Sequence, residues 1–182
     1  MIEIIFTQRM KDILKETKGQ QLKSLEYGKD PVENSIYGNF RLNIDGYAID
    51  VTNEVKPQPF FDEIEDISGF ACCKTDENSP FQPAVVSDSQ IIPVAETITG
   101  VEIVTDEICV NHGEYRISFD TALIIRTANK TLMFTRDVWF SEVITFSQND
   151  DYNAVIPVQD VAESWSNEGE YCVDVKRSKE VL

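Results

Sequence analysis

The sequence predicts an α+β protein in which β-structure dominates, with antiparallel sheets, a short N-terminal helix and a short helix near residues 157–165. Two observations support this fold class. Apolar and polar residues alternate with a period of two in many stretches, as in Phe40, Leu42 and Ile44, whereas helical spacing is confined to short segments. The 182 residues include 10 Phe, 6 Tyr and 2 Trp, so the chain has enough apolar surface to bury a core.

The N-terminal segment is expected to be helical over about residues 7–18. Met10, Ile13 and Leu14 recur at helical spacing, and Gly19 follows as a stop signal. Residues 22–27 are expected to be extended.

A β-hairpin is expected over about residues 39–54. Two alternating segments flank Asp45 and Gly46, and this dipeptide is a favoured two-residue hairpin loop. The prolines of residues 56–59 are expected to interrupt the pattern, and residues 67–74 are expected to resume it as a strand.

The second half of the chain is also expected to be rich in strands. Strands are expected within residues 101–110, 115–119, 123–125, 132–134 and 171–175, with turns at 111–114 and 128–130. Residues 139–146 fit a strand or a helix. Residues 157–165 fit a short helix, because Pro157 stands at its start and Asp160 in its first turn.

An internal repeat is indicated by an offset of 75 residues. It places residues 38–52 (GNFRLNIDGYAIDVT) over residues 113–127 (GEYRISFDTALIIRT) and repeats the pattern G-x-[FY]-R-[LI]-x-[IF]-D without a gap. We therefore expect a duplicated β-rich unit, with chance similarity between two strands as the alternative. The expected units are residues 1–76 and 97–182, joined by a Pro-containing connection at 77–96, although one compact domain over 1–182 fits equally well.

The net charge of -16 restricts the partners that we expect. Asp and Glu number 32 against 16 Lys and Arg, and this field repels phosphate backbones and anionic membranes. We expect no direct nucleic-acid binding and no membrane binding. The imbalance is sharpest between Lys74 and Arg116, where no Lys or Arg occurs and the acidic residues are Asp76, Glu77, Asp88, Glu96, Glu102, Asp106, Glu107 and Glu114.

The location expected from the sequence is a bacterial cytoplasm. Residues 1–9 lack the basic and apolar regions of a signal peptide, and no apolar run is long enough for a membrane-spanning helix. The 4 cysteines have no zinc-site spacing and are expected to be reduced thiols.

Catalytic motifs are largely missing, and we expect neither an enzyme nor a bound cofactor. The sequence has 1 histidine, His112, which lies in a predicted turn three residues after Cys109. Asn149, Asp151 and Asn153 alternate as in a calcium loop, but the glycine and distal glutamate of that motif are missing. We therefore predict no metal ligands.

Two segments combine aromatic residues with an excess of acids. The first is the expected partner-binding segment: Phe60, Phe61, Asp62, Glu63, Glu65 and Asp66, together with Ile64. The second is the base-free stretch 137–175, which contains Trp139, Tyr152 and Trp165. Such mixtures can dock on a basic partner, whereas the alternative is a loop whose aromatic residues pack into the core.

The repeat also matches Arg41 with Arg116. We expect each to pair with a carboxylate of its own unit, such as Asp45 or Asp120. The functional alternative places both arginines at the junction of the units, where they would bind an anionic ligand.

The function expected from these features is that of a non-enzymatic, acidic protein-binding module, of the immunity, inhibitor or mobile-element accessory type, with a basic protein as its partner. One alternative is a carboxylate-based or metal-assisted enzyme with a site between the two units. Another is a structural protein that assembles through exposed strand edges.

Overall fold

The computed structural model describes residues 1–28, 32, 34–85, 88–136 and 139–182. Over these residues the chain is β-dominant, which confirms the predicted fold class. The helical elements are α1 (Gln8–Lys15), α2 (Val158–Trp165) and the short 3-10 helices η1 (Asn111–Gly113) and η2 (Tyr152–Ala154). The strands are β1 (Ile2–Ile4), β2 (Gln21–Gly28), β3 (Ser35–Tyr37), β4 (Asn39–Ile44), β5 (Tyr47–Phe60), β6 (Glu63–Thr75), β7 (Ser89–Val110), β8 (Tyr115–Thr127), β9 (Thr131–Arg136), β10 (Val143–Gln148) and β11 (Val173–Val181).

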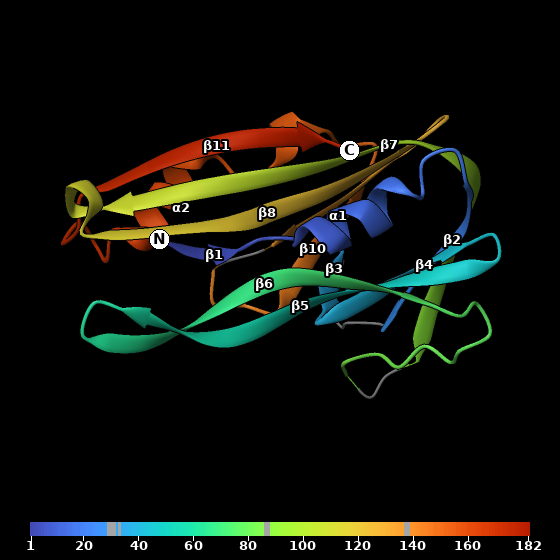
Figure 1. Ribbon diagram of the computed structural model, residues 1–182, viewed down its shortest axis with the longest axis horizontal. Helices are drawn as coiled ribbons and strands as arrows, with labels where there is room; N and C mark the ends of the chain where they lie inside the picture. The colour runs from blue at the N-terminus through green and yellow to red at the C-terminus, as the bar shows by residue number, and fades with distance from the viewer. Residues whose placement is uncertain (29–31, 33, 86–87, 137–138) are drawn as a thin grey trace.

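These strands form a single sheet that folds over on itself. The order is β3-β10-β9-β8-β7-β2-β4-β5-β6, with β1 added in parallel to β8 and β11 added antiparallel to β7. Figure 1 shows two layers, with β7, β8 and β11 in the upper one and β4, β5 and β6 in the lower one. The long strand β7 joins the layers, because residues 89–97 pair with β2 and residues 98–110 pair with β8.

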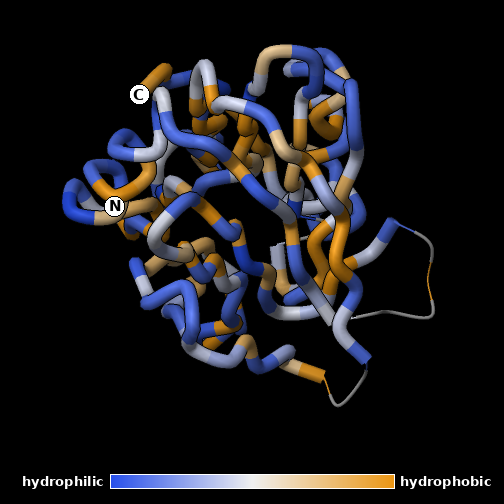
Figure 2. Tube along the Cα trace, turned by 90° about the vertical axis from the view of Figure 1, so that its right-hand side faces the viewer, coloured by the Kyte–Doolittle hydropathy of each residue, from blue (hydrophilic) through white to orange (hydrophobic). Residues whose placement is uncertain are grey.

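The main core lies between the two layers. The strands alternate between hydrophobic and hydrophilic positions along the trace in Figure 2, as expected of sheets with one buried face. Phe40 of β4 stacks on Phe134 of β9 with ring centroids 3.9 Å apart, which joins the layers. Helix α1 adds its buried Leu14 to this core, and the Thr7 side chain accepts a hydrogen bond from the Met10 amide at the start of the helix.

A second apolar cluster lies under α2. Val161 and Trp165 of this helix pack against Ile117 and Phe119 of β8 and against Ile67 of β6. The predicted short helix near residues 157–165 is therefore present, and it covers β8 at one end of the molecule.

The hairpin predicted over residues 39–54 is present, but the predicted break at residues 56–59 is wrong. Strand β5 continues to Phe60 and pairs with β6, with Pro57 opposite Asp66 and Pro59 opposite Ile64. Proline is tolerated there because β4 pairs with β5 only as far as Thr52, so the rest of β5 is hydrogen-bonded on one side.

The predicted connection 77–96 also differs from the structure, because β7 begins at Ser89 within it. Pro93 lies in a part of β7 that pairs only with β2, at an irregularity in the register. Proline is therefore tolerated there, as in β5, because this part of the strand is hydrogen-bonded on one side only. The main core contains residues of both predicted units, for example Leu25 and Ile125.

The two halves of the sequence repeat have different secondary structure. Residues 38–52 contain β4, a turn with Gly46 at φ +84°, and the start of β5. In residues 113–127, Gly113 ends η1 and residues 115–127 form one continuous strand, β8, in which Thr121 is an extra residue between two register positions. The duplication stays a prediction that this comparison does not support.

Among the helices of the described residues, none has the length and apolar character needed to cross a membrane.

Candidate functional site

The tip of the β5–β6 hairpin forms one wall of the candidate site. The pairing ends at Phe60 and Glu63, which leaves Phe61 and Asp62 as the turn. Phe61 has φ +51°, a left-handed conformation that costs a non-glycine residue about 1–2 kcal/mol. Its ring stacks on Tyr171, with centroids 5.3 Å apart, and meets the edge of Phe60 at 4.9 Å. These contacts hold the tip against the opposite layer.

The second wall consists of the end of α2 and the turn that leads to β11. The backbone amide of Tyr171 donates to the carbonyl of Ser166 over 2.9 Å, and this closes the turn and directs Tyr171 back toward the hairpin. Trp165, the last residue of α2, is 3% exposed, and its ring centroid lies 4.9 Å from that of Trp139. In Figure 1 the hairpin tip and α2 lie at the same end of the molecule.

Between these walls lies a cavity of about 500 Å³, which we call the aromatic groove. Its lining combines aromatic rings with carboxylates, and no lysine or arginine is among the described residues that line it. The lining residues are Phe60, Phe61, Asp62, Glu63, Glu65, Trp139, Ser164, Trp165, Asn167, Glu170 and Tyr171. Ring faces carry negative partial charge, so rings and carboxylates attract the same class of ligand, a cation.

The aromatic groove brings together the two segments that the sequence singled out separately. Five of the six predicted partner-binding residues line it, and the exception is Asp66, which is exposed and lies opposite Pro57 in the hairpin. Trp139 and Trp165 come from the base-free stretch 137–175, whereas Tyr152 of that stretch packs elsewhere, beside Val155. Glu170 and Tyr171 also lie in that stretch, but the sequence did not single them out, because only the turn after α2 brings them to the groove.

A tyrosine behind the groove is buried with its hydroxyl unpaired. The Tyr115 ring lies 4.9 Å from Phe60, and its hydroxyl has no hydrogen-bond partner among the described residues. Burial raises the pKa of Tyr115 to about 12, so this side chain stays neutral and acts as part of the apolar wall.

The structure does not bring Arg41 and Arg116 together. Arg41 of β4 is buried and donates to both carboxylate oxygens of Asp50, at 2.6 and 2.9 Å, so its expected partner Asp45 was wrong. This hydrogen bonding to Asp50 raises the pKa of Arg41. Arg116 is exposed at the start of β8 and has no ion pair within the described part of the chain. Its expected partner, Asp120, accepts hydrogen bonds from the Phe6 amide and Thr105 instead.

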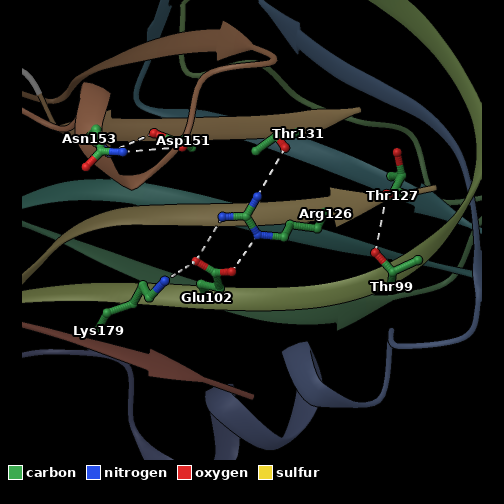
Figure 3. Close-up of polar contacts among 8 residues, drawn as sticks. All are labelled: Thr99, Glu102, Arg126, Thr127, Thr131, Asp151, Asn153 and Lys179. Carbon is green, nitrogen blue, oxygen red and sulfur yellow. Dashed lines mark hydrogen bonds and ion pairs between the residues drawn. The ribbon is translucent and has the colours of Figure 1, made fainter. Parts of the chain in front are cut away.

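The candidate catalytic and metal-binding residues do not converge on one centre. His112 is exposed in η1 with φ +59°, and Cys109 lies opposite Arg116 in the β7–β8 ladder. Asp151 accepts hydrogen bonds from the backbone and side-chain amides of Asn153, as Figure 3 shows for the side chains. Within the described ranges, no group of three or more His, Cys, Asp or Glu residues is arranged to hold a metal ion. All 4 cysteines are free.

Comparisons with known proteins found no matching family model, no matching curated protein and no matching solved structure.

Proposed function

We propose that this protein is a binding module that docks a basic segment of a protein partner in the aromatic groove. The observation that carries the proposal is the composition of the groove, in which five aromatic side chains and four carboxylates, but no lysine or arginine of the described residues, line a 500 Å³ cavity. No reacting group needs to be supplied by the protein for this activity.

The rings supply the short-range attraction. A guanidinium or ammonium group over an aromatic face gains about 0.5–1 kcal/mol at an exposed site and about 2 kcal/mol or more when it is desolvated. Trp139 and Tyr171, which are half-buried, present such surfaces in one cavity, so a single arginine or lysine side chain can contact more than one ring.

The carboxylates supply the charge pairing and the long-range attraction. Asp62, Glu63 and Glu65 lie on the hairpin side of the groove, and Glu170 lies on the opposite side. A cation that enters between them can form ion pairs with carboxylates of both walls. The net charge of -16 adds a field that increases the association rate of a basic partner and weakens as salt is added.

A protein partner fits the surroundings of the groove better than an isolated small cation. Ile64 on the hairpin is 68% exposed, and Phe140, whose ring lies 5.3 Å from Trp139, is 57% exposed. Apolar side chains of this kind beside a cavity are typical of surfaces that become covered in a complex. Phosphate groups are disfavoured by the carboxylates, so the same groove does not suit a nucleic acid.

An arginine-rich peptide, titrated while tryptophan fluorescence is recorded, tests the proposal. The sequence has 2 tryptophans, and both line the groove, so the signal reports on this end of the molecule. We expect a saturable change that weakens as salt rises. The double variant Asp62→Lys/Glu65→Lys should lower the affinity by about tenfold or more, because it replaces attraction by repulsion at the cavity.

A matched control separates the groove from the general charge of the protein. Asp88→Lys/Asp150→Lys makes the same change in net charge at two exposed residues that do not line the groove. This variant should retain most of the affinity. Equal losses in the two double variants would show that the peptide follows the overall field, and the proposed docking site would then be wrong.

A further inference from the structure

A second, smaller cavity lies between α2 and the sheet. Its volume is about 40 Å³, and it shares Trp139, Ser164 and Trp165 with the aromatic groove. Its remaining lining residues come from β8, β9 and the α2 region: Phe119, Thr121, Arg136, Ile156 and Val161. The cavity is therefore mostly apolar, with one arginine in its wall.

Arg136, the last residue of β9, is 4% exposed and forms no ion pair with another described residue. Its Nη1 donates to the carbonyl of Ser68, and its guanidinium lies 4.2 Å from the centre of the Phe119 ring. The Nε–H group has no acceptor, and no carboxylate of the described residues lies within ion-pair distance of this side chain. Burial lowers the pKa of Arg136 to about 10, so the guanidinium remains charged at neutral pH.

The neighbouring carboxylates are occupied by other donors. Both oxygens of Asp106 bind Arg177 at 2.7 Å, and one of them also accepts from Thr121 at 2.6 Å. Asp120 accepts from the Phe6 amide at 2.6 Å and from Thr105 at 2.7 Å. Among the described carboxylates, Asp106 and Asp120 therefore act on the positive charge of Arg136 only at a distance.

A second lining residue of the same cavity carries a buried donor without a partner. The indole Nε1–H of Trp165 is buried and has no acceptor among the described residues. Leaving one buried donor unpaired costs about 1–3 kcal/mol. Two unpaired donors and no unpaired acceptor in one cavity call for a ligand that only accepts hydrogen bonds.

We propose that this cavity binds a small, weakly hydrated monovalent anion of the chloride class, held by Arg136 and Trp165. The volume suffices, since a water molecule requires roughly 10–15 Å³ of such space and chloride is not much larger. A monovalent ion is favoured over sulfate or phosphate because the cost of moving an ion into apolar surroundings rises steeply with its charge. The anion site shares Trp165 with the aromatic groove, but it is inferred from the unpaired donors of Arg136 and Trp165 and not from the proposed docking of a basic partner.

Thermal unfolding in chloride and in gluconate at constant ionic strength tests this site. We expect a saturable rise in Tm of about 3 °C or more as sodium chloride replaces sodium gluconate. Arg136→Met should abolish the rise, whereas Arg116→Met, which removes an exposed arginine, should leave it unchanged. A rise that is the same in Arg136→Met and in the unmodified protein would overturn the assignment, as would the lack of any chloride effect.

Two further measurements keep the test decisive if Arg136→Met does not fold. Trp165→Phe keeps a ring in the cavity but removes the N–H donor, and it should raise the chloride concentration at half-saturation by about tenfold, since a hydrogen bond to a charged acceptor is lost. Crystals soaked in bromide should show an anomalous peak between Arg136 Nε and Trp165 Nε1. A water molecule at this position in bromide-soaked crystals would contradict the proposal.

Discussion

Replacing Glu102 by glutamine removes the charge at the centre of a three-residue network on the β7–β8–β11 surface. Glu102 is 6% exposed, and its carboxylate accepts from Arg126 Nε at 2.5 Å and Nη2 at 3.3 Å and pairs with Lys179 Nζ at 3.2 Å, as Figure 3 shows. Hydrogen bonds to charged groups contribute about 1.5–3 kcal/mol each. The side chains of Arg126 and Lys179 are 34% and 36% exposed and regain water in the variant, so we expect a loss of about 1–3 kcal/mol in the free energy of unfolding.

The pH dependence of this loss gives a sharper test than its size. Arg126 hydrogen-bonds the Glu102 carboxylate and holds its pKa below the ordinary value. A lowered pKa in the folded state stabilises the protein above the unfolded-state pKa of about 4.3, and this contribution is lost as the pH falls through the folded-state pKa. Below both values Glu102 is protonated and nearly isosteric with glutamine. The difference between the two proteins should therefore be largest near neutral pH and shrink in acid.

Urea unfolding between pH 7 and pH 2.5 measures this difference. Glu54→Gln, which removes an exposed carboxylate of β5, is the matched control and should change the stability by less than about 0.5 kcal/mol at every pH. A Glu102→Gln effect that is constant with pH would show that the ion pairs with Arg126 and Lys179 do not contribute to stability.

Three further predictions concern the buried polar residues and the packing of the N-terminus. Burial raises the pKa of Asp120, and a raised pKa contributes stability that is present below the unfolded-state pKa and is lost as the pH rises. In urea unfolding, Asp120→Asn should therefore become less destabilising, relative to the unmodified protein, from about pH 4 to pH 7. The opposite trend with pH would contradict this prediction. Asp106→Ala should lower the free energy of unfolding by about 3–5 kcal/mol in the same assay because Arg177 loses its partner inside the protein. The double variant Asp106→Ala/Arg177→Met should recover part of this stability. No recovery would argue against the pairing of Asp106 with Arg177. Gly69→Ala should lower the free energy of unfolding by about 1–3 kcal/mol because the added methyl group meets the side chain of Ile4. The double variant Gly69→Ala/Ile4→Ala should lose less stability than the two single variants lose together. Strict additivity of the two losses would show that the two sites do not touch.

The local pattern of the sequence predicted most of the elements but not their length. The helix expected at residues 7–18 is α1, and the Asp45–Gly46 loop joins β4 to β5 as expected. The strands extend past three prolines at which a break or a connection was predicted, since Pro57, Pro59 and Pro93 lie in parts of strands that pair on one side only. Which part of a strand lacks a second neighbour depends on the order of strands in the sheet, and this order is not encoded locally.

The candidate site was predictable in part for the same reason. Five groove residues stood out because an acidic and aromatic segment interrupts an alternating pattern. The opposite wall follows more than 70 residues later in the chain, and its position depends on α2 packing over β8. The buried Arg136 gave no signal either, because an arginine at the end of a strand is normally exposed, and here it lies with Trp139 and residues of α2 around a small cavity.

The most direct measurement of cation docking is an NMR titration of the indole N–H resonances with an arginine-rich peptide. The chain gives two such resonances, from Trp139 and Trp165, and the peptide is expected to shift at least one of them saturably in the unmodified protein and in Asp88→Lys/Asp150→Lys but not in Asp62→Lys/Glu65→Lys. Binding that leaves both indole resonances in place would show that basic segments attach elsewhere on this acidic surface.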